Sequence, residues 1–400
     1  MKQHKHHRIQ TQAVHAGERP DPTTGASSPN LVMSSTYVTE ADAVFSANDL
    51  TPDMPYIYTR WANPTTKQLE EKLAVLENGE AALAFATGMA AITNLFLYLL
   101  KPGDHLVMSD VAYAGNVEFV HETLPNFGVE VSFVNMSNLD SVAEAIRPNT
   151  RLVYVESPAN PIMRLTDIKT VAELAHAAGA ELAADSTFST PIATRPLDLG
   201  ADYVIHSLTK YIGGHGDALG GAVIGRAEQI NSLRQTISIH MGSTISPFNS
   251  WLIMRGAVTL PLRMRAHETG ALKVAQFLED HPKVTKVMYP GLPSHPQHEL
   301  AQRQMANFSG MLTFQVEDGP AMAQQLSKRM KVFHYAVSLG HHRSLIFYLS
   351  TEDMQRSTFR LKPAGLARYR QFAGDGIFRT SIGIEDPQDL CDDLAQALGS

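Results

Sequence analysis

Cysteine is almost absent from this sequence of 400 residues, in which Cys391 is the only one. A single thiol cannot form an internal disulfide, so a disulfide-stabilised secreted scaffold is excluded and a reducing, cytoplasmic location is expected. Long apolar runs are also missing. The longest run of large apolar residues, Leu95 to Leu100, is far shorter than the roughly 20 residues of a membrane-spanning helix. We therefore expect no membrane partner.

Excess positive charge and nucleotide-binding motifs are absent as well. The chain has 33 Lys and Arg against 40 Asp and Glu, a formal net charge of -7, which argues against a nucleic-acid partner. The sequence has no G-x-G-x-x-G and no Walker lysine, which disfavours a dinucleotide or a nucleoside triphosphate. The Lys- and His-rich start, Met1 to Arg8, has no apolar segment behind it and is not typical of a signal peptide.

The length is comfortable for two domains. Residues 1–60 show little periodicity and many turn residues, so they are interpreted as an extended N-terminal arm. Residues 61–255 are assigned to a large domain and residues 256–400 to a C-terminal α+β domain. The large domain opens with a helix that Asn63-Pro64 begins and Asn78-Gly79 ends.

Strand-like and helix-like segments then alternate up to about residue 225. Near-continuous apolar strands between amphipathic helices predict an α/β fold with a buried, mostly parallel sheet. A ligand is expected at the carboxyl ends of its strands. The predicted strands are His105–Met108, Val129–Asn135, Arg151–Glu156, Glu181–Ala184, Ala201–His206 and Gly221–Ile224, and the predicted helices are Met89–Leu100, Val117–Leu124, Leu139–Ile146 and Ile168–Ala178. Beyond them we predict a long helical stretch, then strands at Lys283–Tyr289, Gly310–Val316 and Ser344–Leu349 and helices at Ala321–Met330 and Pro387–Leu398.

The most informative segment runs from Ser207 to His215, with Lys210 directly after an apolar strand. A buried lysine beside another cation has a lowered pKa, which suits an amine that attacks an aldehyde. The hydroxyls of Ser207 and Thr209 are suited to binding phosphate oxygens, and the glycines allow the backbone to approach a cofactor. The alternative is a glycine-rich turn with an incidental lysine.

Two further elements fit the same chemistry. Asp185 ends the strand that precedes the lysine strand, where its carboxylate can pair with a protonated ring nitrogen, although such residues are more often helix caps or turn residues. Gly88 and Met89 lie at a strand-to-helix turn whose backbone N–H groups can bind an anion, although many such turns serve only packing.

Together these residues resemble a known family. The matching segments are Tyr58-Thr59-Arg60, Gly88-Met89, Tyr113, Glu156 to Pro161, Asp185, Ser207 to Asp217 and Arg379. They are similar to the Cys/Met-metabolism group of pyridoxal-phosphate enzymes, which includes cystathionine γ-synthase, cystathionine lyases and methionine γ-lyase. The resemblance implies an aspartate-aminotransferase-like fold (fold type I), a seven-stranded type of sheet and a homotetramer of close dimers.

The resemblance also implies a role for each matching residue. Lys210 is expected to hold pyridoxal 5'-phosphate as a Schiff base and Asp185 to pair with its ring nitrogen. The phosphate is expected on Gly88, Met89, Ser207 and Thr209, and on Tyr58 and Arg60 of a neighbouring subunit. Tyr113 is expected to stack on the ring and act as an acid or base. Arg379, with Ser338 and Asn160, is expected to bind the carboxylate of a small amino-acid substrate.

The sequence departs from this family near the far end of the substrate. Members commonly carry Gly-Gly-x-Glu-Ser after a Ser-Leu pair, whereas this chain has Gly340-His341-His342-Arg343-Ser344. If Arg343 faces the pocket, an anionic leaving group is expected, and if Glu352 or Asp353 faces it, a cationic one such as that of canavanine. These charges can also pair elsewhere.

The predicted activity is cleavage of the bond between Cγ and a heteroatom in a homoserine-type amino acid of the canavanine, cystathionine or methionine class. A γ-replacement enzyme, either a cystathionine γ-synthase or an O-acylhomoserine sulfhydrylase, is the alternative. β-Elimination also stays open. A metal site at His206, His215 and Asp217 is disfavoured because these residues lack a usual ligand spacing. A non-catalytic module with the same fold is disfavoured because Lys210 and its partners are all present.

Overall fold

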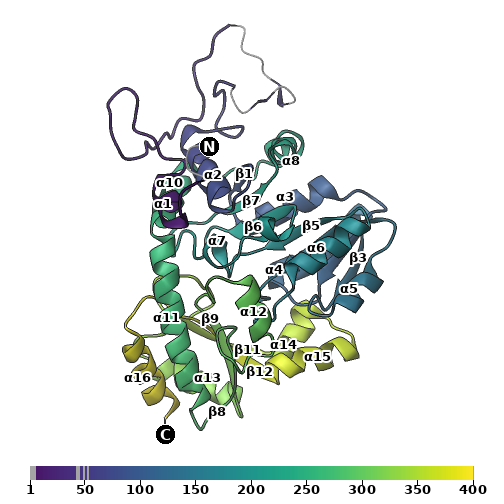
Figure 1. Ribbon diagram of the computed structural model, residues 1–400, viewed down its shortest axis with the longest axis vertical. Coiled ribbons are helices and arrows are strands. Elements are labelled where there is room, and N and C mark those ends of the chain that lie inside the picture. The colour runs from purple at the N-terminus through teal and green to yellow at the C-terminus, as the bar shows by residue number, and fades with distance from the viewer. Residues whose placement is uncertain (1–5, 42–45, 48–49, 52–53, 400) are drawn as a thin grey trace.

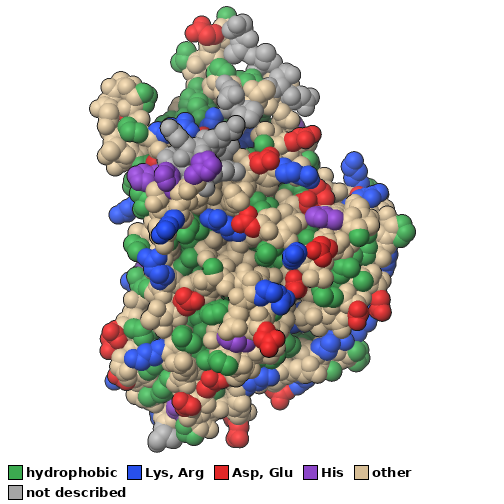
Figure 2. All heavy atoms as spheres, viewed as in Figure 1, with side chains coloured by type: hydrophobic (Ala, Val, Ile, Leu, Met, Phe, Trp, Pro, Cys, Tyr) green, Lys and Arg blue, Asp and Glu red, His purple; other side chains and the backbone are tan. Residues whose placement is uncertain are grey.

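The structure is a computed structural model that describes residues 6–41, 46–47, 50–51 and 54–399. It contains a seven-stranded and a five-stranded sheet, and the twenty-residue helix α11 (Leu260–Glu279) runs between them along one side of the molecule (Figure 1). On the face shown in Figure 2, acidic and basic side chains are interspersed. No helix in the described part of the chain is long and apolar enough to cross a membrane.

The larger sheet has the strand order β1-β7-β6-β5-β4-β2-β3. Its strands are β1 (Ala81–Phe85), β2 (His105–Ser109), β3 (Glu130–Val134), β4 (Thr150–Glu156), β5 (Glu181–Asp185), β6 (Tyr203–Ser207) and β7 (Gly221–Gly225). β7 pairs antiparallel with both of its neighbours, β1 and β6, and the other strand pairs of this sheet are parallel. The predicted α/β fold with a mostly parallel sheet is confirmed.

Helices cover both faces of this sheet, because its strands are apolar on both sides. α3, α4 and α8 pack on one face, and α2, α5, α6 and α10 pack on the other. The helices are α2 (Pro64–Leu76), α3 (Gly88–Leu99), α4 (Ala114–Glu122), α5 (Leu139–Ala145), α6 (Ile168–Ala177), α7 (Thr190–Ala193), α8 (Ala227–Leu233), α9 (Ile239–Met241) and α10 (Pro247–Val258). The predicted helices of this region therefore exist close to their predicted bounds.

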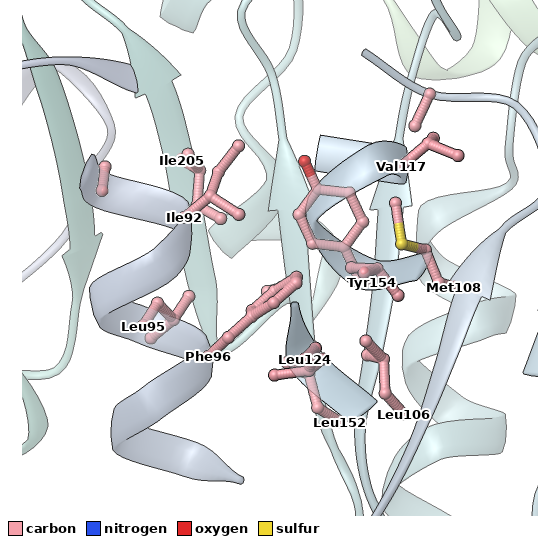
Figure 3. Close-up of a cluster of buried hydrophobic side chains, with 14 of the residues drawn as sticks. Ile92, Leu95, Phe96, Leu106, Met108, Val117, Leu124, Leu152, Tyr154 and Ile205 are labelled. Carbon is pink, nitrogen blue, oxygen red and sulfur yellow. The ribbon is translucent and has the colours of Figure 1, made fainter. Parts of the chain in front are cut away.

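The largest core cluster lies beneath α3 (Figure 3). Phe96 and Tyr154 are fully buried, and their rings meet edge to face with centroids 5.4 Å apart. Such a pair is favoured by the ring quadrupoles in addition to the apolar area that it removes from water. The Tyr154 hydroxyl points out of this cluster and reaches the carboxylate of Asp185 at 3.3 Å. The core thereby supports a polar residue at the end of β5.

The N-terminal arm contains a helix that was not predicted, α1 (Ile9–His15), which packs on α2, α10 and α11. Lys72 of α2 is fully buried beneath it. Its ammonium donates to the carbonyl of Ala13 at 2.5 Å and pairs with Glu18 at 2.9 Å. Burial lowers the pKa of Lys72, and Glu18 opposes that shift. The expectation of an arm extended throughout was wrong, because this buried cation holds its first turns on the domain.

The C-terminal sheet has the strand order β10-β11-β12-β9-β8. Its strands are β8 (Val284–Met288), β9 (Met311–Val316), β10 (His334–Tyr335), β11 (Leu345–Ser350) and β12 (Gly376–Ser381), and its helices are α12 (His298–Gln304), α13 (Gly319–Arg329), α14 (Thr351–Met354), α15 (Pro363–Ala373) and α16 (Pro387–Leu398). A π-helical segment, Gln355–Phe359, links α14 to α15. The strands predicted at the positions of β8, β9 and β11 are confirmed, whereas β12 was missed.

One close backbone contact fixes α10 against the turn that follows Lys210. A Cβ added to Gly256 would lie 2.1 Å from the carbonyl oxygen of Gly213. Gly365 in α15 provides a matched helical glycine, because the nearest atom to its added Cβ is an ordinary 3.4 Å away.

We predict that Gly256→Ala lowers the free energy of unfolding by about 1–3 kcal/mol, as overpacking does. Gly365→Ala should leave it unchanged or raise it by up to about 1 kcal/mol, since alanine is the better helix former. Urea denaturation of both variants measures the difference. Equal midpoints for the two variants would show that the contact at Gly256 carries no constraint.

Candidate active site

Three neighbouring strands, β4, β5 and β6, end in the polar residues Glu156, Asp185 and Ser207. Carboxyl ends of parallel strands meet at one edge of a sheet, so these side chains face a common space. That space is a cavity of about 660 Å³, and Lys210, Ser338 and Arg379 line it as well. We call it the cofactor cavity. The cavity lies at the carboxyl ends of the strands, where a ligand site was expected.

Lys210 follows β6 by three residues, in a turn whose N–H at Lys210 donates to the carbonyl of Ser207 at 3.2 Å. Its amine donates to the hydroxyl of Ser338 at 3.3 Å. Burial, and then the positive charge of Arg379, lower the pKa of Lys210 to about 8. At pH 7 roughly one-tenth of the amine is therefore uncharged and nucleophilic, far more than for a lysine with its ordinary pKa.

Asp185 is buried at the end of β5. Its carboxylate accepts hydrogen bonds from the Tyr154 hydroxyl at 3.3 Å and the Thr187 N–H at 2.9 Å. Burial raises its pKa, and the hydrogen bonds from Thr187 oppose that shift. A buried carboxylate of this kind is stabilised by a cationic N–H that reaches it through the cavity.

The start of α3 lines the cavity beside the end of β6, and its backbone is suited to binding an anion. Thr87 caps the helix by accepting the N–H of Ala90 at 3.0 Å, and the cavity is lined by Gly88 and Met89. A Cβ added to Gly221 on β7 would lie 2.1 Å from the carbonyl of Thr87, so glycine allows the helix start to press on the sheet. Free N–H groups at a helix N-terminus favour a phosphate.

The hydroxyl residues predicted to bind the phosphate line the same cavity. Ser207 lies directly against Gly88, whose added Cβ would be 2.9 Å from the Cβ of Ser207. Thr209 is fixed by the N–H of Gly220, which donates to its hydroxyl at 3.1 Å. The structure thus brings Gly88, Met89, Ser207 and Thr209 together.

Glu156 organises the substrate side of the cavity, a role that was missed from the sequence. Its two carboxylate oxygens accept the N–H groups of Tyr113 and Asn160, each at 2.8 Å. Burial, followed by the negative charge of Asp185, raises the pKa of Glu156 to about 8, and the two backbone hydrogen bonds oppose that rise. The only sequence signal was its place in the segment Glu156 to Pro161. Tyr113, at the start of α4, keeps a ring that is 45% exposed at the cavity.

Arg379 reaches the cavity from β12 of the C-terminal sheet. It donates to the side-chain oxygen of Asn160 at 3.1 Å and to the carbonyl of Ser338 at 3.3 Å. Burial lowers its pKa to about 10, so it remains a cation at neutral pH. A guanidinium held by two acceptors beside an open space is suited to binding a carboxylate.

Four predicted site residues do not line the cofactor cavity. Tyr58 is 40% exposed, and Arg60 lies over its ring and donates to the carbonyl of Ile239 at 2.6 Å. Arg343 and Glu352 are both exposed at the surface of this chain. Neither distal charge is brought to the cavity, because Arg343 lies in an open loop and Glu352 in the first turn of α14.

The donor set fits pyridoxal phosphate. It supplies an amine with a lowered pKa, a buried carboxylate, a helix N-terminus with two hydroxyls and an aromatic ring, all on one cavity. His206 is buried elsewhere against Glu77, with Nε2 and Oε1 2.5 Å apart, and does not join the cavity. The fold and this site define a fold type I pyridoxal-phosphate enzyme.

Comparisons with known proteins agree. Residues 10–399 match the family described as "Cys/Met metabolism PLP-dependent enzyme", and the chain belongs to that family. It is 43% identical to a canavanine gamma-lyase of Pseudomonas canavaninivorans, over 97% of this chain and 95% of the relative. A cystathionine gamma-synthase of Mycobacterium tuberculosis is 41% identical, over 97% and 96%. The crystal structure of metB from Corynebacterium glutamicum is similar with a TM-score of 0.89 and 37% identity, over 98% of each chain.

Membership of this family establishes the general class of reaction. The chain is a pyridoxal-phosphate-dependent enzyme that acts on amino acids, as a lyase or a transferase. The alternative of a non-catalytic module is therefore set aside.

We predict that in cofactor-free protein the acetylation rate of Lys210 rises with pH to a midpoint near 8, where its pKa lies. Below that pH the amine is charged and unreactive. Arg379→Leu should move the midpoint upward, because a neighbouring positive charge is removed. Pulse labelling with acetic anhydride and mass spectrometry of the Lys210 peptide measure both midpoints.

The matched control is Arg356→Leu, which removes a surface arginine with an exposed side chain (78%). Its midpoint should equal that of the unmodified protein. A midpoint for Lys210 above 10, or equal shifts in the two variants, would contradict the assigned cause.

Proposed function

We propose that this chain is a γ-lyase that carries pyridoxal phosphate on Lys210 and cleaves the Cγ–heteroatom bond of a homoserine-type L-amino acid. One observation carries the proposal. Lys210, Asp185, Tyr113 and Arg379 converge on one cavity from two sheets. Relatives at about 40% identity are named as γ-lyases and γ-synthases, which supports chemistry at Cγ.

The residues on one side of the cavity are assigned to binding the cofactor. When bound, pyridoxal phosphate supplies an electron-withdrawing ring that stabilises negative charge at the substrate Cα. Asp185 is placed to hold the ring nitrogen in its protonated form. The phosphate is assigned to the N–H groups of Gly88 and Met89, with the hydroxyls of Ser207 and Thr209.

The residues on the other side are assigned to binding the substrate and moving its protons, on the basis of their charges and hydrogen bonds. Arg379 binds the amino-acid carboxylate, and Asn160 contributes its side-chain amide beside it. Ser338 orients this arginine through its carbonyl and meets Lys210 through its hydroxyl. Lys210 takes the proton from Cα, since its amine is partly uncharged near neutral pH. Tyr113 donates a proton to the leaving heteroatom as general acid.

Canavanine is the first substrate that we propose to test, since the relatives include two canavanine gamma-lyases, at 43% and 41% identity. The second candidate is γ-replacement, because cystathionine gamma-synthases are nearly as similar, at 41%. The cavity itself does not separate the two, since the rest of its lining includes the apolar residues Ile92, Phe188 and Leu339, which fit either leaving group.

We also propose a cytoplasmic homotetramer in which the sites are shared. Tyr58 and Arg60 lie in the arm, outside the cofactor cavity of their own chain. Their exposed or partly exposed side chains are available to the phosphate of a neighbouring subunit. Tyr58→Phe and Lys210→Ala subunits, once mixed and reassembled, would then recover part of the activity in hybrid dimers.

We predict that purified protein is yellow and that Lys210→Ala loses both the visible absorption band and essentially all turnover, because Lys210 is the one lysine among the described residues that line the cavity. Absorption spectra with added pyridoxal phosphate test this. Lys286→Ala, which removes a lysine bonded to the carbonyl of Gln371 outside the cavity, is the control and should stay yellow. A wild type that gains no visible band would refute the proposal.

We predict that canavanine has a kcat/KM at least about tenfold above that of methionine, and that it is turned over without a thiol. Cystathionine and O-succinylhomoserine complete the comparison, with the keto acid, homoserine or thioether products identified. O-Succinylhomoserine turned over only with L-cysteine would identify γ-replacement instead. Arg343→Glu and Glu352→Gln should change these constants less than about threefold, since both residues lie outside the cavity.

A further inference from the structure

A chain of polar atoms leads from the amine of Lys210 out of the cofactor cavity. The amine donates to Ser338 Oγ at 3.3 Å. Ser338 Oγ lies 3.2 Å from His341 Nε2. His341 does not line the cavity, and it is only partly buried. It is therefore linked to the reacting lysine through one hydroxyl, and its side chain is partly accessible to water.

The backbone on both sides holds the His341 ring in place. Gly216 has a φ of +73°, and a Cβ there would lie 2.7 Å from His341 Cε1. Gly340, with a φ of +72°, presses the loop onto the lysine turn, since its added Cβ would lie 2.6 Å from the N–H nitrogen of Tyr211. Only glycine fits either position without strain. The imidazole is thus packed against the turn that carries Lys210.

The charges around the ring keep it neutral. Burial lowers the pKa of His341, and the nearby positive groups Lys210, His342 and Arg343 lower it further, while Asp217 opposes them. A neutral imidazole has one nitrogen that accepts a proton and one that releases a proton. With Nε2 toward Ser338, Nδ1 is the nitrogen left to exchange with water.

We propose that His341 is a proton-relay residue through which Lys210 exchanges its proton with solvent. This inference rests on the proposed role of Lys210 as the proton carrier. The amine gives a proton to Ser338 Oγ while the Ser338 hydroxyl proton moves to His341 Nε2. The imidazolium then releases its Nδ1 proton to water. No bond between heavy atoms changes, and one proton has left the site.

The test uses cofactor-loaded enzyme with L-norleucine, which has no leaving group, in D₂O. NMR follows the replacement of its Cα hydrogen by deuterium, which requires the lysine proton to exchange. We expect His341→Ala and His341→Gln to slow this replacement by about tenfold or more, within the range of acid–base effects. Added imidazole should restore the rate in His341→Ala and leave the wild type unchanged. His342→Gln, next to the relay, is the control and should match the wild type.

These outcomes separate a relay from a structural role. Glutamine keeps a hydrogen bond to Ser338 but has no nitrogen that takes up and releases a proton in this pH range, so full exchange in His341→Gln would overturn the proposal. Unchanged exchange in His341→Ala, or no rescue by imidazole, would also overturn it.

A second readout needs no turnover. In cofactor-free protein, the ¹⁵N shifts of the His341 imidazole should move in Ser338→Ala and in Lys210→Met, and those of His342 should not. A wild type that is colourless or exchanges no Cα hydrogen would refute the proposed function. The imidazole shifts would still decide whether the relay exists, since shifts unmoved in both variants would refute it.

Discussion

The site depends on one buried carboxylate. Glu156 accepts the N–H groups of Tyr113 and Asn160, so a single residue fixes both the ring at the cavity and the amide that meets Arg379. It sits opposite Asp185 in the pairing of β4 with β5, which brings two buried carboxylates together. The charge of Asp185 adds to burial in raising the pKa of Glu156, and the two N–H donors and Arg379 oppose that rise. The positive charge of a bound cofactor ring would therefore stabilise the negative charge that is buried at the ends of β4 and β5.

The lysine side shows the complementary arrangement. Lys210 and Arg379 are two cations at one cavity, and each is held by Ser338, through its hydroxyl or its carbonyl. Burial, and then the charge of Arg379, lower the pKa of the lysine, and the arginine remains charged because its pKa starts higher. Arg379 on β12 thus contributes to the reactivity of a lysine in the large domain.

The sequence predicted the lysine segment and the sheet strands that flank it, because these signals are local. The resemblance to the family was needed for residues far from that segment, such as Tyr113 and Arg379, which line the same cavity. It missed β1, since the segment Ala81–Phe85 is mostly alanine, which has a low preference for strands. It missed α1, which packs on α2, α10 and α11 and accepts a hydrogen bond from the distant Lys72. Glu156 lies between the N–H groups of Asn160 and Tyr113, and Tyr113 is 43 residues away in the sequence. A pattern of a few residues cannot predict that Tyr113 comes close to Glu156.

The position of Arg379 has a consequence for selectivity. The guanidinium belongs to the C-terminal sheet, whereas Asn160 and Lys210 belong to the large domain. A carboxylate bound there would meet residues of both domains, which already pack against each other through shared apolar clusters. A decarboxylated amine would leave the arginine without its anion. Discrimination between an amino acid and its amine would then depend on groups that both domains supply.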